Sequence, residues 1–341
     1  MKAILINTTF QIGHHGCTLV DRQIDQLASA CGLVIAAKLP LHADWSTLAP
    51  RYFDLVLVNG EGGLHHDSKA AKRIADVPSW ASERGRPAFL FNSVYEANGP
   101  DIAAGVARYD AIFVRDEYSR AALGAAGIPS AVVPDLALGW SPPAKGGTGR
   151  AIVVTDSTLR ETNAQLHAFA RAIGARFLPL MARPPRPLVD VHADLFRWSR
   201  YVSKRFASFL APPGLWRDRW RGLIPGFEDF VAWLTDNAGL IIAGRFHGLC
   251  LALDLEIPVL AVPSNTRKIE GVLEAAALQS RLVENLDLLR HRLAQEGPEA
   301  FAYSDDEVAK LRSFRTRAAV DANRMFEMMH EHAEGTLRRK H

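Results

Sequence analysis

The chain has 341 residues, and its 48% hydrophobic and 23% charged residues are typical of a globular protein, which excludes a disordered or coiled-coil chain. A single hydrophobic core rarely grows to this length, so we expect two domains. The formal net charge of +3 gives no indication of a nucleic-acid partner, and we expect none.

Cysteine spacing and hydropathy indicate in which cellular compartment the protein lies. Cys17, Cys31 and Cys250 lie far apart without a C-x-x-C pair, which predicts neither a disulfide framework nor a zinc site. The N-terminus lacks the basic and long apolar regions of a secretory signal. The most apolar stretch, 239–255, is interrupted by an arginine, a histidine and an aspartate, so it is not expected to span a membrane. We therefore expect a cytoplasmic protein.

Residues 1–143 show short apolar runs that alternate with segments of helical pattern. Helices are predicted at 19–30 and at 119–126, the second with Gly127 as its C-cap. Such alternation predicts an N-terminal lobe built on a parallel sheet covered by helices. The expected strands are 3–6, 33–36, 54–58, 88–91, 111–114 and 131–133.

The segment 141–149 is rich in Pro and Gly and is the clearest linker in the chain. A second βα series follows it and predicts a C-terminal lobe over 150–300. Beyond this lobe, a charged helical pattern over 305–336 predicts a long helix that packs back on the first lobe. The fold class is therefore α/β, with two doubly wound lobes facing a cleft. In the second lobe we expect strands at 151–154, 177–180, 239–243 and 259–262, and helices at 164–173, 227–237 and 248–255.

The segment 195–222 departs from this rhythm. It carries seven basic residues against a single acid, Asp218, together with seven aromatic residues. Such a mixture suits a helix that contacts anionic headgroups at the inner face of a membrane, or a platform for a lipid-linked sugar. An ordinary cationic helix whose aromatic side chains pack inward explains the pattern equally well.

A glycine-rich loop is expected after the strand at 54–58. Gly60, Gly62 and Gly63 would sit at the carboxyl end of a parallel sheet, where ligands bind. Glycines there let the backbone approach an anion closely and donate N–H groups to it. A tight strand-to-helix turn would explain the same glycines without any ligand.

The sequence Gly244-Arg245-Phe246-His247-Gly248 is the strongest candidate site. It follows a predicted strand and opens a helix, so a guanidinium, an imidazole and a helix N-terminus meet within a few residues. This combination can bind a carboxylate or phosphate and deliver a proton. A structural salt bridge beside a core histidine is the alternative, but two polar side chains at a strand's carboxyl end favour function.

Other polar residues follow predicted strands as well. Arg115, Asp135 and Lys268 each come after a strand. Together with Arg245, Arg115 and Lys268 give three cations from separate strand ends, which would suit a triply charged donor. His14 and His15 follow the first strand, and without a third ligand of known spacing we interpret them as polar residues of the cleft rather than as a metal site. No hydrolase elbow, P-loop or zincin motif is present.

Several of these blocks occur in the order seen in the polysaccharide pyruvyltransferases, which the chain resembles over about residues 1–285. The blocks are Asn59-Gly60-Glu61-Gly62-Gly63-Leu64, Val114-Arg115-Asp116-Glu117-Tyr118-Ser119, Val133-Pro134-Asp135, Gly244-Arg245-Phe246-His247-Gly248, Glu256-Ile257-Pro258-Val259 and Lys268. The chain departs from the family near its start, where an Asn-x-Gly-Asp-like motif is usual and Gly13-His14-His15-Gly16-Cys17 stands instead.

The resemblance implies two Rossmann-like lobes similar to the GT-B glycosyltransferases. It also implies a transferase that moves the enolpyruvyl group of phosphoenolpyruvate onto a sugar of a cell-surface polysaccharide, or its lipid-linked precursor, as a pyruvyl ketal. In exopolysaccharide synthesis of this kind, the first lobe would bind the acceptor and the second lobe the donor. No cofactor and no metal are implied.

Ketal formation assigns roles to the candidate residues. His247 is the expected proton donor, and Arg245 with Arg115 would clamp the carboxylate and phosphate. Lys268, Gly248 and the glycine loop would complete the donor site. Either Asp135 or Asp67 would deprotonate or orient the sugar hydroxyl. The remaining residues expected to bind the acceptor are His14, His15 and His65.

Two other functions remain open from the sequence. A GT-B glycosyltransferase could use the same arginines and histidine to hold a nucleotide sugar, because a fold does not fix a function. An envelope-assembly scaffold recruited through the segment 195–222 is the weaker alternative, since a scaffold has no need for cations at three strand ends.

Overall fold

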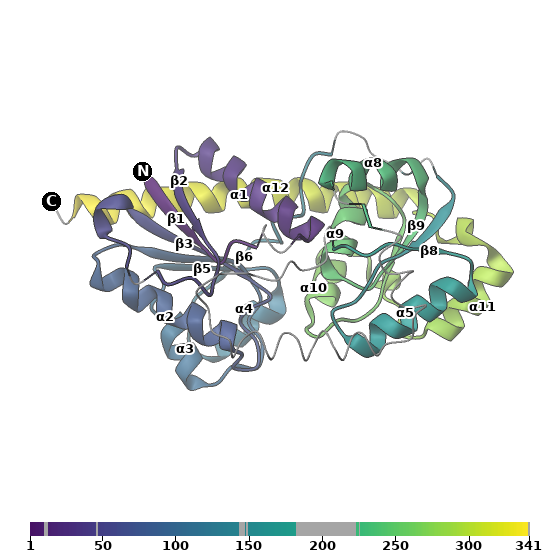
Figure 1. Cartoon of the computed structure of the whole chain (residues 1–341), viewed down its shortest axis with the longest axis horizontal. Coiled ribbons are helices and arrows are strands. Elements are labelled where there is room, and N and C mark those ends of the chain that lie inside the picture. The colour runs from purple at the N-terminus through teal and green to yellow at the C-terminus, as the bar shows by residue number, and fades with distance from the viewer. Residues whose placement is uncertain are drawn as a thin grey trace, which may run out of the picture.

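The computed structural model describes residues 1–9, 13–45, 47–142, 147, 149–181, 223–224 and 226–339. Its strands form two separate parallel sheets, one in each half of an elongated molecule (Figure 1). Helices lie against both faces of each sheet, so the predicted α/β class with two doubly wound lobes is confirmed.

The first lobe contains a six-stranded sheet of order β2-β1-β3-β4-β5-β6. Its β3 continues through Gly60 to Glu61, three residues beyond the predicted end, because it pairs with β4 as far as Glu61 and Ser93. Part of the predicted loop is therefore strand. The strands are β1 (Lys2–Ile6), β2 (Val34–Leu39), β3 (Leu55–Glu61), β4 (Ala88–Ser93), β5 (Ala111–Val114) and β6 (Ala131–Val132).

Side chains alternate between the two faces of this sheet, as expected for strands buried on both sides. Leu5 and Leu57 join one hydrophobic core with α1 and α12, whereas Ile4 and Val56 join another with α2 and α3. The helical segments of the first lobe are α1 (His15–Ala30), η2 (Pro50–Tyr52), α2 (Lys69–Glu83), α3 (Pro100–Val106) and α4 (Glu117–Ala125).

The second lobe contains a four-stranded sheet of order β10-β9-β7-β8. A strand was predicted over 177–180, but β8 ends at Phe177, since the amide of Leu180 donates to the Asp156 side chain at 3.0 Å instead of to the backbone of β7. The strands are β7 (Ala151–Val154), β8 (Arg176–Phe177), β9 (Ala238–Ala243) and β10 (Val259–Ala261). The helical segments are α5 (Arg160–Ala172), α8 (Phe227–Asn237), α9 (Phe246–Asp254), α10 (Lys268–Ala275), η3 (Gln279–Arg281), α11 (Leu286–Glu296) and η4 (Pro298–Phe301).

Helix α12 (Asp305–Arg338) connects the two lobes along one side of the molecule (Figure 1). It begins at a capping box in which Ser304 and Glu307 satisfy each other's backbone N–H groups. Its apolar stripe then follows the first sheet, where the ring of Phe326 packs edge-on against Phe91 at 5.5 Å between centroids. The helix therefore belongs to the core of the first lobe, although it directly follows the second lobe in the sequence.

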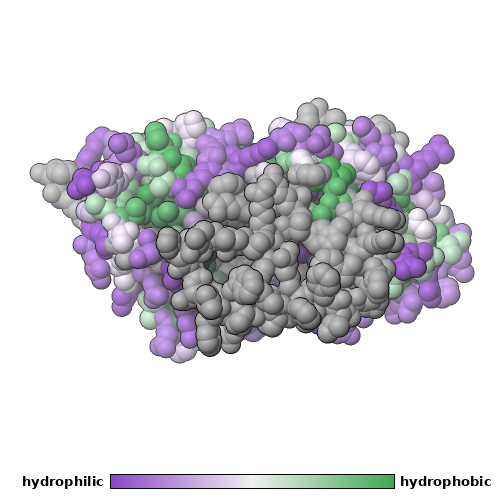
Figure 2. All heavy atoms as spheres, viewed as in Figure 1, coloured by the Kyte–Doolittle hydropathy of each residue, from purple (hydrophilic) through white to green (hydrophobic). Residues whose placement is uncertain are grey.

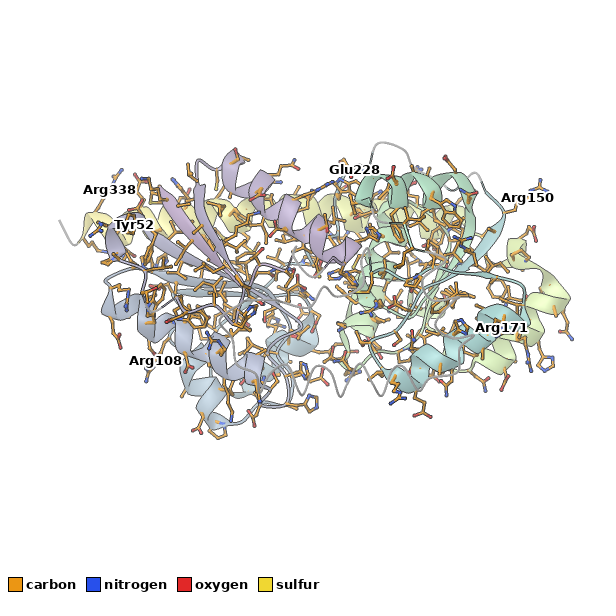
Figure 3. All side chains as sticks on the ribbon, viewed as in Figure 1. Tyr52, Arg108, Arg150, Arg171, Glu228 and Arg338 are labelled. Carbon is orange, nitrogen blue, oxygen red and sulfur yellow. The ribbon has the colours of Figure 1, made fainter. Side chains whose placement is uncertain are left out.

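Helix α1 also crosses between the lobes. The amide of His15 donates to the carbonyl of Leu180 at 2.9 Å, and Arg22 pairs with Glu228 of α8 at 2.5 Å. Glu228 lies on the outer side of the second lobe in Figure 3. The N-terminus of α1 is thus held by the second lobe.

The surface is mixed in character. On the face shown in Figure 2, hydrophilic residues prevail over the described parts of both lobes, with smaller hydrophobic areas between them. Among the described residues, none of the helices is long and apolar enough to cross a bilayer. The basic and aromatic segment 195–222 lies outside the described residues.

Candidate active site

The site lies where the carboxyl ends of the first-lobe strands meet the second lobe. Three non-glycine residues at or beside the ends of β1, β3 and β4 have left-handed backbones: Asn7 (φ 68°), Glu61 (φ 48°) and Asn92 (φ 53°). Such conformations are costly for residues with a Cβ and tend to occur where function requires a particular side-chain position. Hydrogen bonds hold them, since Asn7 Nδ2 donates to the Asn59 carbonyl at 2.6 Å and Asn92 Nδ2 to Asn59 Oδ1 at 2.9 Å.

Arg115 is the centre of this edge and follows β5 directly. Its Nη2 lies 2.7 Å from Glu61 Oε2, and its Nε lies 2.7 Å from Asp135 Oδ2. Burial works against the charge of the guanidinium, but Asp135 and then Glu61 raise the pKa of Arg115 above its ordinary value. The pKa of Glu61 is lowered, because Arg115 and then His247 outweigh the effect of burial. The three groups therefore form a charged, buried cluster of one cation and two carboxylates.

His247 reaches this cluster from the second lobe. It lies in the first turn of α9, and its Nε2 is 3.9 Å from Glu61 Oε2 and 3.8 Å from Asp135 Oδ1. Burial lowers the pKa of His247, while Asp135 and Glu61 act in the opposite direction. Its Nε2 is buried without a hydrogen-bond partner among the described residues. The imidazole is thus aimed at the carboxylates without being bonded to them.

The first turn of α1 holds His247 from another side. A Cβ at Gly16 would lie 2.2 Å from Cβ of His247 and 2.3 Å from its Cγ. Only glycine permits this approach, because real Cβ atoms do not come within 3.0 Å of another heavy atom. Position 16 therefore limits where the imidazole can lie.

Arg245 stands at the N-cap of α9 and is oriented by an acid from β7. Its Nη2 lies 2.6 Å from Asp156 Oδ2, whose other oxygen accepts the amide of Leu180 at 3.0 Å. The neighbouring Thr155 Oγ1 accepts the amide of Gly244 at 2.9 Å. The ends of β7 and β9 are thereby fixed to each other, and the Arg245 guanidinium has a defined position.

Lys268 begins α10 and reaches across to the first lobe. Its Nζ donates to Asn265 Oδ1 at 3.1 Å and lies 3.8 Å from the position that a Cβ on Gly62 would occupy. Burial, followed by the charge of Arg115, lowers the pKa of Lys268 to about 8. A pocket between the lobes is lined by Lys268 and Arg267 on one side and by Glu96, Asp116 and Tyr118 on the other. The ammonium therefore borders both the arginine cluster and a space large enough for a small ligand.

The two histidines at the start of α1 have different surroundings. His14 caps α1 by accepting the amide of Cys17, and its ring lies edge-on to His247 at 5.5 Å between centroids. His15 instead stacks on Phe230 at 4.0 Å, and burial lowers its pKa to about 4. The structure therefore brings His14 to the site and places His15 in the packing against α8.

His247 and two residues beside it have side chains that can bind a metal ion. One ligand atom each from His14, Cys17 and His247 lie within 4.8 Å of one another. Burial lowers the pKa of His14 well below its ordinary value and raises that of the Cys17 thiol to about 12. Burial lowers the pKa of His247 as well, and the neutral imidazole is the form that coordinates a metal.

Several of the glycines selected from the sequence make packing or backbone contacts within the protein. A Cβ on Gly60 would lie 2.2 Å from Ser93 Oγ, and the amide of Gly63 donates to the carbonyl of Gly60. The amide of Gly248 likewise donates to the backbone carbonyl of Arg245. Because these N–H groups are already engaged, the glycine facing the Lys268 ammonium, Gly62, is the better placed of the set for an anion.

Two candidates lie on the loop after β3. His65 is half-buried, and its pKa is lowered by burial, by His66 and by the charge of Lys268. Asp67 is exposed and accepts the amide of Gly99 at 2.8 Å, immediately before α3. The structure therefore gives Asp67 a turn-forming contact and leaves His65 nearer to the site.

Glu61, Asn92 and Asp156 were not among the residues selected from the sequence. Each is a polar residue at the end of a buried strand, the same signal that selected Arg115 and Asp135. Glu61 lies within the glycine-rich motif, and the sequence interpretation of that motif rests on its glycines alone. Applying the strand-end rule to every strand would have found all three.

Taken together, the site combines three cations, three carboxylates and an imidazole at the meeting of two sheets. Arg245 and Lys268 can bind an anion, His247 can transfer a proton, and Glu61 can accept one. The arrangement fits the transfer of a small anionic group to a hydroxyl.

The sequence profile of the polysaccharide pyruvyl transferase family matches residues 14–266. This range includes every cluster residue above except Lys268, which follows it by two positions. No curated protein gives a significant match to the chain.

Among solved structures, a protein described as a UDP-N-acetylglucosamine 2-epimerase from Listeria monocytogenes is similar in fold, with 12% identity, coverage of 98% of this chain and 97% of that chain, and a TM-score of 0.52. Acinetobacter baumannii MurG covers 97% of this chain and 100% of its own at 11% identity, with a TM-score of 0.47. The fold is thus the two-lobed arrangement of the GT-B glycosyltransferases. The profile match covers most of the chain together with its arginine cluster, and the chain belongs to the polysaccharide pyruvyl transferase family.

Proposed function

We propose that this protein transfers the pyruvyl group of phosphoenolpyruvate to two hydroxyls of one sugar in a cell-surface polysaccharide or its lipid-linked precursor. The observation that carries the proposal is the position of His247, whose Nε2 lies within 3.9 Å of two carboxylates from the opposite lobe. Carboxylates at that distance stabilise an imidazolium, which is the form that donates a proton.

The reaction balances without a cofactor. Protonation of the methylene carbon gives an oxocarbenium centre, and two sugar hydroxyls form C–O bonds to it as the C–O bond to phosphate breaks. Of the two hydroxyl protons, one makes up for the proton placed on the new methyl group and the other leaves with phosphate. His247 is the proposed proton donor to carbon.

We assign the binding of the donor's negative charges to residues of the second lobe. Arg245, oriented by Asp156, and Lys268, opposite Gly62, would bind the carboxylate and phosphate. Arg115 is already paired with two carboxylates that offset its charge, so we assign it the positioning of Glu61 rather than a direct clamp on the donor.

The acceptor is assigned to the first lobe. Asp135 is fully buried and engaged by Arg115 and by the amide of Ala137, which leaves it poorly placed to reach a sugar. The Glu61 side chain keeps 12% of its surface exposed beside His247. We therefore propose that Glu61 orients or deprotonates the acceptor hydroxyl, with His14 and His65 near the sugar. Contact with the inner face of a membrane through 195–222 stays a prediction, because that segment lies outside the described residues.

Calorimetric titration tests the donor. Wild-type protein is titrated with phosphoenolpyruvate and, separately, with a panel of nucleotide sugars and nucleotides, beside the double variant Arg245→Ala/His247→Ala. The matched control is Arg290→Ala/His291→Ala, which removes an exposed arginine and histidine from α11 of the same lobe.

We expect wild type and control to bind phosphoenolpyruvate and the site variant to lose that binding. Binding of nucleotides alone would overturn the proposal and reassign the protein as a glycosyltransferase. Phosphoenolpyruvate binding that survives in the site variant would place the donor elsewhere.

A further inference from the structure

The first turn of α1 carries a feature that pyruvyl transfer does not use. His14 and Cys17 flank Gly16, and the contact of Gly16 with His247 presses this turn against the imidazole. One ligand atom from each of the three side chains lies within 4.8 Å of the others. We propose that His14, Cys17 and His247 form a binding site for a divalent metal ion of borderline softness, with Zn²⁺ the ion that fits the ligand set.

The ligand types support this assignment. Two imidazoles and one thiolate are a set that zinc accepts, and three protein ligands leave one coordination position for water or an anion. Zinc bonds of about 2.0–2.3 Å in tetrahedral geometry place ligand atoms roughly 3.3–3.7 Å apart. The three atoms therefore need to approach one another by at most about 1 Å, which small side-chain rotations can supply.

The burial of the ligands gives independent support. His247 and His14 are 8% and 6% exposed, and the Nε2 of His247 has no hydrogen-bond partner among the residues that the structure describes. An unbonded imidazole nitrogen in such a place is unfavourable unless something occupies it. Glu61 and Asp135 lie 3.9 and 3.8 Å from that nitrogen and supply negative charge around the incoming cation.

Occupation of the site has a structural consequence. His14 and Cys17 belong to α1 of the first lobe, and His247 belongs to α9 of the second. A bound ion would join the lobes at their active site and withdraw His247 from proton transfer. Zinc would thus act as a reversible inhibitor, an extension that rests on the proposed function, whereas the binding itself does not.

The test uses the whole chain, purified with chelator and without phosphoenolpyruvate. Zn²⁺ is titrated calorimetrically in two buffers of different ionisation enthalpy, which reports the proton that the Cys17 thiol releases on coordination. Co²⁺ serves as an optical probe, because a thiolate–cobalt bond gives a charge-transfer absorption that histidine and carboxylate ligands do not.

The variants are chosen to keep the fold. We expect Cys17→Ser to abolish the Co²⁺ absorption and to weaken Zn²⁺ binding more than about 100-fold. His14→Asn keeps a side chain that caps a helix but coordinates zinc poorly, and should weaken binding similarly. Cys31→Ser, at the other end of α1, is the matched control and should bind as wild type does.

Three results would overturn the proposal. Absence of Zn²⁺ binding by wild type, or unchanged affinity in both Cys17→Ser and His14→Asn, overturns the proposal. Loss of binding in a His65→Asn/His66→Asn variant, with Cys17→Ser unaffected, would overturn it too and assign the ion to that exposed histidine pair. Since no donor is present, failure of pyruvyl transfer leaves these results unchanged.

Discussion

Two buried arginines of the described residues, Arg115 and Arg315, are each held by two carboxylates, and they differ in what surrounds them. Arg115 contacts Glu61 and Asp135 at the strand ends, beside an imidazole nitrogen that lacks a hydrogen bond among the described residues. Arg315 of α12 contacts Asp254 Oδ1 and Glu256 Oε1, both at 3.0 Å, and donates to the carbonyl of Trp140 at 3.0 Å.

The second cluster joins elements that must stay together. Asp254 ends α9 and also accepts the amide of Gly139, so α12, α9 and the chain leaving the first lobe are fixed at one point. All three donor groups of Arg315 thus have partners within the protein. A buried ion cluster alone therefore does not indicate catalysis, and what distinguishes the Arg115 cluster is an imidazole at strand ends whose Nε2 has no hydrogen-bond partner among the described residues.

Breaking the proposed catalytic cluster around His247 should have the largest effect. His247→Gln removes the proposed proton donor, and we expect the rate to fall about 10²–10⁴-fold with little change in melting temperature. Phosphate release from phosphoenolpyruvate in the presence of a panel of aryl hexosides measures the rate. A variant within threefold of wild type would remove His247 from the mechanism.

Breaking the structural cluster should instead act on stability. Arg315→Met leaves the buried carboxylate of Asp254 without its cation, and we expect the free energy of unfolding to fall by about 3–5 kcal/mol. Denaturant unfolding measures this. Arg312→Met, which removes an exposed arginine that also contacts Glu256, is the control and should change stability by at most about 1 kcal/mol.

The loss of stability in Arg315→Met should depend on pH. Burial raises the pKa of Asp254 to about 7 although Arg315 opposes the shift, so the native protein binds a proton that the unfolded chain has lost above about pH 4. This contribution is therefore full below pH 4 and declines as pH rises to 7. Without Arg315 the effect of burial is unopposed, so the pKa of Asp254 rises further and the carboxyl group stays protonated at pH 8. The wild-type carboxylate is ionised and stabilised by Arg315 at that pH, so the loss of stability should be greater at pH 8 than at pH 6. Equal losses at both values would contradict the assignment.

Gly16→Ala tests how closely His247 must be held. The added methyl would collide with the imidazole, and a displacement of about 1 Å should lower the rate roughly 10–100-fold. Gly124→Ala in α4, where an added Cβ meets nothing within 4 Å, is the control and should be neutral. If both variants keep wild-type activity, the position of His247 is less constrained than its packing indicates.

The smallest effect concerns Lys268. Because its pKa is lowered to about 8, its charge is present below that pH and is lost above it. Affinity for phosphoenolpyruvate should therefore decline by up to about tenfold per pH unit above pH 8. Lys268→Arg, whose charge persists, should flatten the profile measured by calorimetry. An unchanged slope in this variant would exclude Lys268 as the titrating group.

Much of the fold could be predicted from apolar periodicity, because buried parallel strands such as Leu55–Glu61 and Ala238–Ala243 are nearly continuous hydrophobic runs. The end of β8 and the extension of β3 were predicted less well, since pairing with a neighbouring strand decided them. At the site, the strand-end rule found Arg115, Arg245 and His247, which follow clear strands. It could not show that Glu61 pairs with Arg115 or that Gly16 packs on His247, because those contacts join segments 54 or more residues apart.

Helix α12 has a consequence for the order in which the protein folds. It is synthesised after all the strands of both sheets, yet Phe326 and Met329 complete the core that covers one face of the first sheet. Until α12 has left the ribosome, that hydrophobic face has no cover from this helix, and the first lobe is open to aggregation. Folding of the N-terminal half therefore waits for the C-terminal segment, and expression of residues 1–142 alone should yield an insoluble chain.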